Sequence, residues 1–181
     1  MNSADQTKSR IYLTVLTGFL GAGKTTILNR YLESPFGKGT AVLVNEFGDV
    51  DVDSAIIGAA SEGGKMMSLP NGCVCCEMQD DLSSTLIELA ERHNSEGGIS
   101  SCIIETSGLA VPSSILRTIG RNPLLKSEFE VAQTICVASA NAIIYQANEF
   151  IEAAEQIAIS DKISISKSDL VTDNMVEDIK M

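Results

Sequence analysis

The stretch GFLGAGKT at residues 18–25 decides the fold of this chain. It has the pattern G-x-x-x-x-G-K-T of a phosphate-binding loop, and it directly follows an apolar run at residues 11–16 that predicts a β-strand. Lys24 supplies positive charge to the outer phosphates, and the Thr25 hydroxyl suits Mg²⁺. Residues 26–32 are helix-like, so the positive end of a helix would also face the phosphates. We therefore expect a bound nucleoside triphosphate, with contacts at Gly18, Gly21, Ala22, Gly23, Lys24, Thr25 and Thr26.

The rest of the chain alternates apolar runs with helix-like stretches. The further strands are expected at residues 40–44, 101–104, 134–138 and 162–166, and the longer helices at residues 81–92, 112–119 and 142–159. Continuous apolar strands between helices predict an α/β fold, a P-loop NTPase with a mostly parallel central sheet and helices on both faces. We expect a flexible tail at residues 1–10, one domain over residues 11–181, and an irregular stretch at residues 46–80.

Composition excludes some classes of function. The formal net charge of −11 disfavours nucleic-acid binding, which needs a positive surface. No apolar run approaches the roughly 20 residues that would span a membrane, and the first ten residues are polar. We therefore expect a cytoplasmic protein with neither nucleic acid nor a membrane as a partner. The oligomeric state stays open, with a homodimer as one candidate.

A second nucleotide motif is predicted at residues 102–108, CIIETSG. An apolar strand ends there in Glu105, and Gly108 follows three residues later. In phosphate-loop enzymes an acid at this position contacts Mg²⁺ directly or through water, and the glycine N–H senses the terminal phosphate. We therefore assign Glu105 and Gly108, together with Lys24, to the catalytic group.

Residues 166–169, SKSD, resemble the N-K-x-D loop with which GTPases read guanine. In that loop the acid accepts hydrogen bonds from guanine and the lysine stem packs over the base, which are the roles expected of Asp169 and Lys167. Ser166 departs from the usual asparagine. The alternative is that the serine and the aspartate only cap a helix.

Three of the five cysteines fall within one four-residue stretch, 73–76, of a glycine-containing turn. They are Cys73, Cys75 and Cys76. Thiolates suit Zn²⁺ well, and Co²⁺ and Ni²⁺ accept related sites, so the cluster predicts a transition-metal site. The alternatives are small residues in a tight turn, or a redox pair, although adjacent cysteines form only strained disulfides. Cys102 and Cys136 lie inside apolar runs and are expected to be buried thiols.

The loop after the second expected strand, NEFGD at residues 45–49, lies where a nucleotide-sensing switch would be. Its Glu46, with Asp51 and Asp53 beyond, could complete a metal site or reach the Mg²⁺ shell, and a solvated acidic turn is an equal alternative. The single histidine, His93, is expected near the C-terminal end of a helix rather than as a ligand.

Together, these motifs closely resemble the CobW-type metallochaperone GTPases, which are relatives of HypB and UreG, the nickel-insertion GTPases of hydrogenase and urease. The resemblance implies that Lys24 and Thr25 bind phosphate and Mg²⁺, and that Lys167 and Asp169 read guanine. It also implies that Cys73, Cys75 and Cys76 bind the transported metal, with Glu46 as a further candidate ligand. The family's GTPase domain continues past residue 181 and a second domain follows, so we expect this chain to be an N-terminal fragment.

The expected function is a slow GTPase that binds GTP or GDP with Mg²⁺, carries Zn²⁺, Co²⁺ or Ni²⁺, and delivers the metal to a client metalloprotein or to an enzyme of a metal-cofactor pathway. Slow hydrolysis is expected because no arginine is obviously placed as an in-line finger. Two alternatives remain: a phosphate-loop kinase of a small metabolite with incidental cysteines, and a zinc buffer or sensor that ignores nucleotide.

Overall fold

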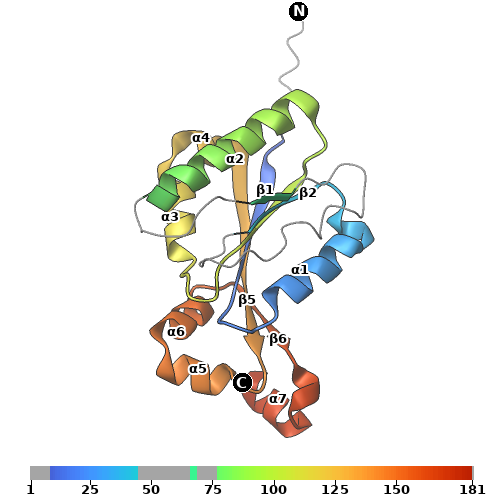
Figure 1. Ribbon diagram of the computed structural model, residues 1–181, viewed down its shortest axis with the longest axis vertical. Helices are drawn as coiled ribbons and strands as arrows, with labels where there is room; N and C mark the ends of the chain where they lie inside the picture. The colour runs from blue at the N-terminus through green and yellow to red at the C-terminus, as the bar shows by residue number, and fades with distance from the viewer. Residues whose placement is uncertain (1–8, 45–65, 69–76, 181) are drawn as a thin grey trace, which may run out of the picture.

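The strands form one parallel sheet. The structure, a computed structural model, describes residues 9–44, 66–68 and 77–180, and all that follows refers to these. Six strands lie in the order β3-β2-β4-β1-β5-β6, and every neighbouring pair is parallel (Figure 1). Their bounds are β1 Ile11–Thr17, β2 Thr40–Val44, β3 Met66–Ser68, β4 Ser101–Glu105, β5 Phe129–Ser139 and β6 Lys162–Ser166. The predicted α/β P-loop architecture is confirmed.

The helices lie between these strands along the chain, except for α7, which follows β6. Their bounds are α1 Lys24–Glu33, α2 Glu77–Glu96, α3 Ser113–Arg121, α4 Pro123–Glu128, α5 Ile143–Glu149, α6 Ile151–Ala158 and α7 Asp173–Lys180, with short 3₁₀ turns η1 Pro35–Gly37 and η2 Ser168–Leu170. No helix within the described residues is both long and apolar enough to cross a bilayer.

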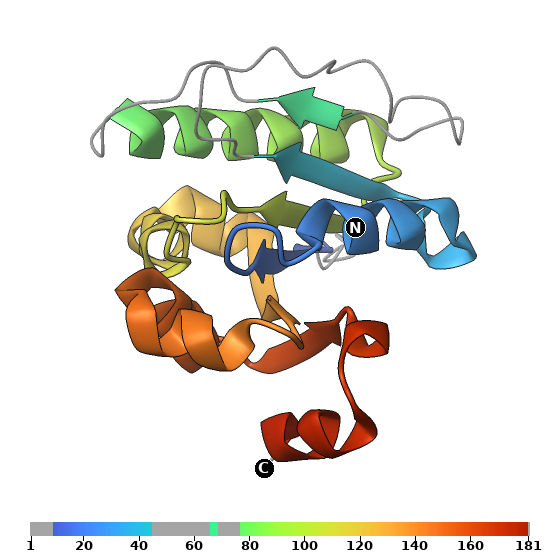
Figure 2. The same ribbon diagram turned by 60° about the horizontal axis from the view of Figure 1, so that its bottom comes forward.

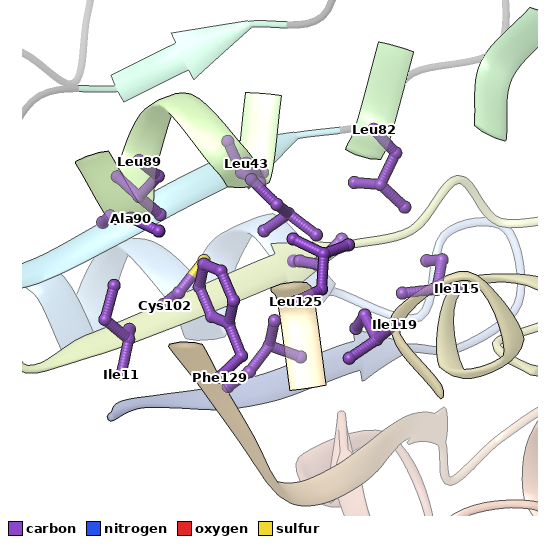
Figure 3. Packing of buried hydrophobic residues seen from close by; sticks show 14 of the residues in the cluster. Ile11, Leu43, Leu82, Leu89, Ala90, Cys102, Ile115, Ile119, Leu125 and Phe129 are labelled. Atoms are coloured by element: carbon purple, nitrogen blue, oxygen red, sulfur yellow. The ribbon is translucent and has the colours of Figure 1, made fainter. Parts of the chain in front are cut away.

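Two apolar layers hold the helices on opposite faces of the sheet. Alternate residues of the central strands face α2, α3 and α4, where Leu43, Cys102 and Ile104 are completely buried (Figure 3). The intervening residues, such as Val42 and Ile103, face α1 and pack with its Leu28. This alternation follows from the two-residue repeat of a strand, and both faces need apolar residues because both are covered.

Parallel pairing brings the functional segments together. The phosphate loop follows β1, the second nucleotide motif follows β4, and the expected guanine loop follows β6. Because all three strands run in the same direction, these loops lie at the carboxyl edge of the sheet, where such sheets bind ligands (Figure 2). Figure 2 also shows α5 and α6 beside the lower strands, away from α2.

Several element boundaries differ from the sequence-based expectation. Strand β3 lies inside the stretch 46–80, which was expected to be irregular throughout, and β5 begins at Phe129 instead of residue 134. The helix expected at residues 142–159 is broken at Phe150, whose backbone is extended, with φ −124° and ψ 118°. The aromatic ring of Phe150 stacks on Phe19 of the phosphate loop, so a tertiary contact accompanies the break.

Candidate nucleotide site

The phosphate loop takes the conformation that its glycines allow. Gly18, Gly21 and Gly23 have φ of 142°, 69° and 95°, in the region that residues with a side chain rarely adopt. At Gly18 space is also limiting, since an added Cβ would lie 2.2 Å from the Val137 carbonyl oxygen. Helix α1 begins immediately afterwards at Lys24, so its unpaired N–H groups open toward the loop.

Lys24 lies within the loop, with its ammonium group donating to the loop's own carbonyls. Its Nζ is 2.8 Å from Gly18 O and 3.4 Å from Phe19 O. Burial lowers the pKa of Lys24 below its usual value, and the negative charge of nearby Glu105 partly offsets this effect. The loop therefore holds a partly desolvated cation, for which phosphate oxygens are a suitable additional partner.

Thr25 and Glu105 come from distant parts of the sequence and meet at this edge. The Thr25 hydroxyl donates to Glu105 Oε1 over 2.7 Å, and the Glu105 side chain is only 4% exposed. Carboxylate and hydroxyl oxygens are the hard ligands that Mg²⁺ prefers. The donor set therefore fits the predicted Mg²⁺, with Thr25 as one ligand and Glu105 in direct or water-mediated contact.

The second motif is anchored to β1 and closely packed on the phosphate loop. Thr106 donates from its backbone N–H to Leu16 O (2.9 Å) and from its hydroxyl to Thr17 Oγ1 (3.0 Å). Gly108 is buried, and an added Cβ would lie 2.8 Å from Leu20 Cα. Only glycine therefore allows this segment to approach the phosphate loop so closely.

The expected guanine loop is linked to the phosphate loop by two side chains. The Ser166 hydroxyl donates to Ala22 O over 2.6 Å, and Lys167 Nζ donates to Gly21 O over 2.8 Å. Lys167 has a left-handed backbone with φ 54°, the single non-glycine residue with positive φ among the described residues. Asp169 lies in η2 with its side chain exposed, so its carboxylate is accessible to a base.

The structure thus brings together most of the predicted nucleotide residues. Thr26 is an exposed residue in the first turn of α1, next to Thr25. Cys102 and Cys136 are buried free thiols, and burial raises their pKa to about 12 and about 11. His93 lies near the end of α2, as expected.

The predicted transported-metal ligands lie outside the described residues. These are Glu46, Cys73, Cys75 and Cys76, and Asp51 and Asp53 lie outside them as well. Among the residues that the structure does describe, no group of three or more histidine, cysteine, aspartate or glutamate side chains could hold a metal ion.

Sequence reasoning missed three residues that contact the site. Phe19 stacks on Phe150 at a ring-centroid distance of 4.7 Å, Leu20 covers Gly108, and Gln156 of α6 donates to the Gly108 carbonyl. The motif pattern marks Phe19 and Leu20 only as variable positions. Gln156 lies in an otherwise ordinary helical stretch, and no local signal marks it.

Comparison with curated proteins finds zinc chaperones among the relatives. The chain is 35% identical over 162 residues to the zinc chaperone YjiA of Escherichia coli (strain K12), covering 88% of this chain and 50% of that protein. It is 38% identical over 147 residues to the zinc chaperone CobW of Sinorhizobium sp, covering 79% of this chain and 40% of that protein. The chain therefore spans half or less of the length of these relatives.

A solved structure of one of these relatives, YjiA, has a fold similar to that of this chain. The Zn(II)-bound YjiA GTPase, as a variant with one glutamate and two cysteines replaced by alanine, superposes with a TM-score of 0.73 at 30% identity. The match covers 94% of this chain and 53% of that one.

A parallel sheet with a phosphate loop after β1, an acid at the end of β4 and a lysine–aspartate loop after β6 defines a P-loop GTPase domain. Residues 12–181 match the family described as "CobW/HypB/UreG, nucleotide-binding domain". The chain belongs to this family, as the resemblance of its motifs predicted.

Proposed function

We propose that this chain is the GTP-binding and GTP-hydrolysing part of a metallochaperone that carries zinc and passes it to a client metalloprotein. One observation carries the nucleotide half of the proposal. Lys24, Thr25 and Glu105 converge at the end of β1, with a cation beside a threonine–carboxylate pair. Two linked segments, the phosphate loop and the loop after β6, provide separate places for the phosphates and the base.

Each side chain has a defined task in this proposal. Lys24 shifts from its own loop carbonyls to the outer phosphates, where its charge offsets theirs. Thr25 and Glu105 hold Mg²⁺, which neutralises developing charge when it is bound. The Gly108 N–H marks the position of the terminal phosphate. Asp169 selects guanine over adenine, and the Lys167 stem packs on the base.

The metal half of the proposal depends on Cys73, Cys75, Cys76 and Glu46. The solved YjiA variant supports this choice. Its replaced glutamate and adjacent cysteines are separated by the same number of residues as Glu46 and the pair Cys75–Cys76 in this chain. Crystals of that variant are nevertheless Zn(II)-bound, so the presence of zinc alone does not identify the site. A test must therefore measure whether the affinity depends on the cysteines and on nucleotide.

We further propose that nucleotide controls the metal site. Residues 46–76 lie in the sequence between β2 and the Glu105 motif, next to segments that respond to a terminal phosphate in switch GTPases. In the GTP state these residues assemble the thiolate site, and hydrolysis relaxes them and releases the metal to the client. Zn²⁺ is the proposed cargo, with Co²⁺ and Ni²⁺ as competitors. Thiolate ligands also need a reducing compartment, which is consistent with the cytoplasm.

The test is a competition titration of Zn²⁺ and Co²⁺ under reducing conditions. It is run without nucleotide, with Mg²⁺·GDP and with a Mg²⁺·non-hydrolysable GTP analogue. The proposal expects the tightest metal binding with the analogue, and loss of that gain in the Cys75→Ser/Cys76→Ser variant. Cys102→Ala is the matched control, because this thiol is buried on the opposite face of β4 from α1.

Three outcomes would overturn parts of the proposal. Equal metal affinity in all three states, with intact nucleotide binding, rejects nucleotide control and favours a zinc buffer. A nucleotide effect that survives Lys24→Ala rejects the phosphate loop as its origin. Preference for ATP over GTP, with no phosphate released in the absence of an acceptor and with transfer of the terminal phosphoryl group to an acceptor once one is added, would indicate a kinase.

A further inference from the structure

Gln156 is a completely buried polar side chain that reaches the second nucleotide motif. It lies on α6, with 0% of its surface exposed, and its Nε2 donates to Gly108 O over 3.1 Å and to Ala110 O over 2.9 Å. Only the amide nitrogen can donate to carbonyls, so these two acceptors define the orientation of the amide. The side chain is therefore hydrogen-bonded to both the first and the last residue of the segment 108–110.

The amide oxygen of Gln156 is not satisfied in the same way. Among the residues that the structure describes, Gln156 Oε1 is buried and has no hydrogen-bond partner. A buried amide oxygen without a donor is energetically unfavourable. The two donated hydrogen bonds therefore determine the orientation of the Gln156 amide, and its oxygen is left without a donor.

Helix α6 is joined to the phosphate loop as well. Phe150, immediately before its first residue, stacks on Phe19 with ring centroids 4.7 Å apart. Phe19 and Gln156 also line the same small cavity. One helix therefore contacts both segments that approach the phosphates: the phosphate loop through Phe150, and residues 108–110 through Gln156.

On the other side, residues 108–110 meet the phosphate loop directly. Leu20 packs against Gly108 so closely that a Cβ there would lie 2.5 Å from Leu20 Cδ2. Gly108 is thus held between Leu20 and the Gln156 amide. The Gly108 N–H and carbonyl belong to the two rigid peptide units that meet at the Gly108 Cα, so fixing the carbonyl leaves only the φ and ψ of Gly108 to redirect its N–H.

We propose that Gln156 is a positioning residue for GTP. It holds residues 108–110 in place before nucleotide binds, so that the Gly108 N–H is directed at the terminal phosphate. It thereby links this segment to α6. The inference rests on the proposed GTPase function and adds a residue that the nucleotide motifs do not contain. Its benefit is preorganisation: a segment that is already ordered loses less entropy when ligand binds.

The main test compares two nucleotides in one matched pair of variants. Gln156→Met keeps the length of the side chain and removes both donated bonds. Gln146→Met is the control, because Gln146 lines the same cavity while the bonds to Gly108 O and Ala110 O both come from Gln156. Affinities for GDP and for a non-hydrolysable GTP analogue are measured by titration with Mg²⁺ present, and kcat and KM are measured with GTP.

The expected result is selective for the terminal phosphate. In Gln156→Met the affinity for the analogue falls about tenfold, as two ordinary hydrogen bonds allow, while GDP affinity changes less than twofold. The value of kcat/KM for GTP falls in parallel. In Gln146→Met both affinities stay within twofold of the wild type. A merely structural role for Gln156 would lower Tm and weaken both nucleotides equally.

A second measurement avoids dependence on the variant's folding. In the wild-type chain, hydrogen exchange at residues 106–111 and 151–158 is compared between the GDP and analogue states. The inference expects protection to change in both segments together. Nucleotide binding that leaves residues 151–158 unchanged while residues 106–111 respond would overturn the link to α6, as would equal effects of Gln156→Met on both nucleotides. A wild-type chain that binds neither nucleotide overturns the proposed function itself.

Discussion

The Thr25 hydroxyl donates a 2.7 Å hydrogen bond to Glu105 Oε1, which joins the start of α1 to the end of β4. The two residues are 80 positions apart in the sequence, and parallel pairing of β1 with β4 brings them together. The hydroxyl and the carboxylate oxygen are thus already side by side. In the proposed site, Mg²⁺ binding would exchange this hydrogen bond for coordination.

Glu105→Gln should weaken Mg²⁺ binding while preserving the shape of the site. The amide lacks the negative charge that attracts the cation, so we expect the Mg²⁺ concentration needed for tight GDP binding to rise about 10- to 100-fold. A Mg²⁺ titration with fluorescent GDP measures this effect. Glu130→Gln is the control, because this partly exposed carboxylate pairs with Arg10 at the surface. An unchanged Mg²⁺ requirement in Glu105→Gln would show that Glu105 does not contribute to the metal site.

Ser166→Ala should loosen the connection between the guanine loop and the phosphate loop. It removes the 2.6 Å hydrogen bond to the Ala22 carbonyl, so we expect about 1 kcal/mol less stability and about fivefold weaker GDP binding. Urea unfolding and nucleotide titration measure these quantities. Ser164→Ala, two residues earlier on the same strand, is the control.

Ser166→Asn should retain nucleotide binding within about twofold, because an amide nitrogen can also donate to that carbonyl. This substitution also introduces the asparagine of the usual guanine motif. The interpretation of Ser166 as a link would be wrong if the alanine variant bound GDP as well as the wild type does.

Gly18→Ala should destabilise the fold severely. The new Cβ would lie 2.2 Å from the Val137 carbonyl oxygen on β5, and the residue's φ of 142° is itself unfavourable for alanine. We expect a loss of at least about 3 kcal/mol in the free energy of unfolding. Gly97→Ala separates the two causes, because Gly97 also has positive φ, at 70°, but nothing lies within 4 Å of its added Cβ. Its cost should be about 1 kcal/mol. Equal costs at both positions would exclude the steric contribution.

The buried thiol of Cys102 should make the fold sensitive to alkaline pH. Burial raises its pKa from 9.0 to about 12, so the unfolded chain loses this proton at lower pH than the folded chain. The contribution of Cys102 to stability is thus fully present below pH 9 and is lost as pH rises toward 12. Between pH 8 and pH 10, the wild type should lose about 1.4 kcal/mol more than Cys102→Ala.

Urea unfolding at the two pH values measures this difference, and comparing slopes removes the cavity cost of the alanine. All other ionisable groups are the same in the two proteins, so their contributions to the pH dependence cancel to first approximation. Parallel pH profiles of the two proteins would contradict a desolvated thiol at this position.

The sequence alone determined the phosphate loop, the strand that precedes it and the α/β class. These are local features: glycine spacing, a lysine–threonine pair and continuous apolar runs specify backbone conformation and burial without distant partners. It also predicted Glu105, Gly108, Lys167 and Asp169 as site residues, because each lies at or just after the end of a recognisable strand. Parallel strands then place such ends along one edge.

Tertiary structure alone decided what joins these motifs. Three contacts connect segments far apart in the chain. Phe150, where the expected helix breaks, contacts Phe19, and Leu20 contacts Gly108. Gln156 donates hydrogen bonds to residues 108 and 110. No periodicity or spacing encodes such contacts, since they depend on how whole elements pack against each other. Ser166 illustrates the same division, because the sequence shows only a departure from asparagine. The fold places its hydroxyl 2.6 Å from the Ala22 carbonyl, where a short side chain is sufficient.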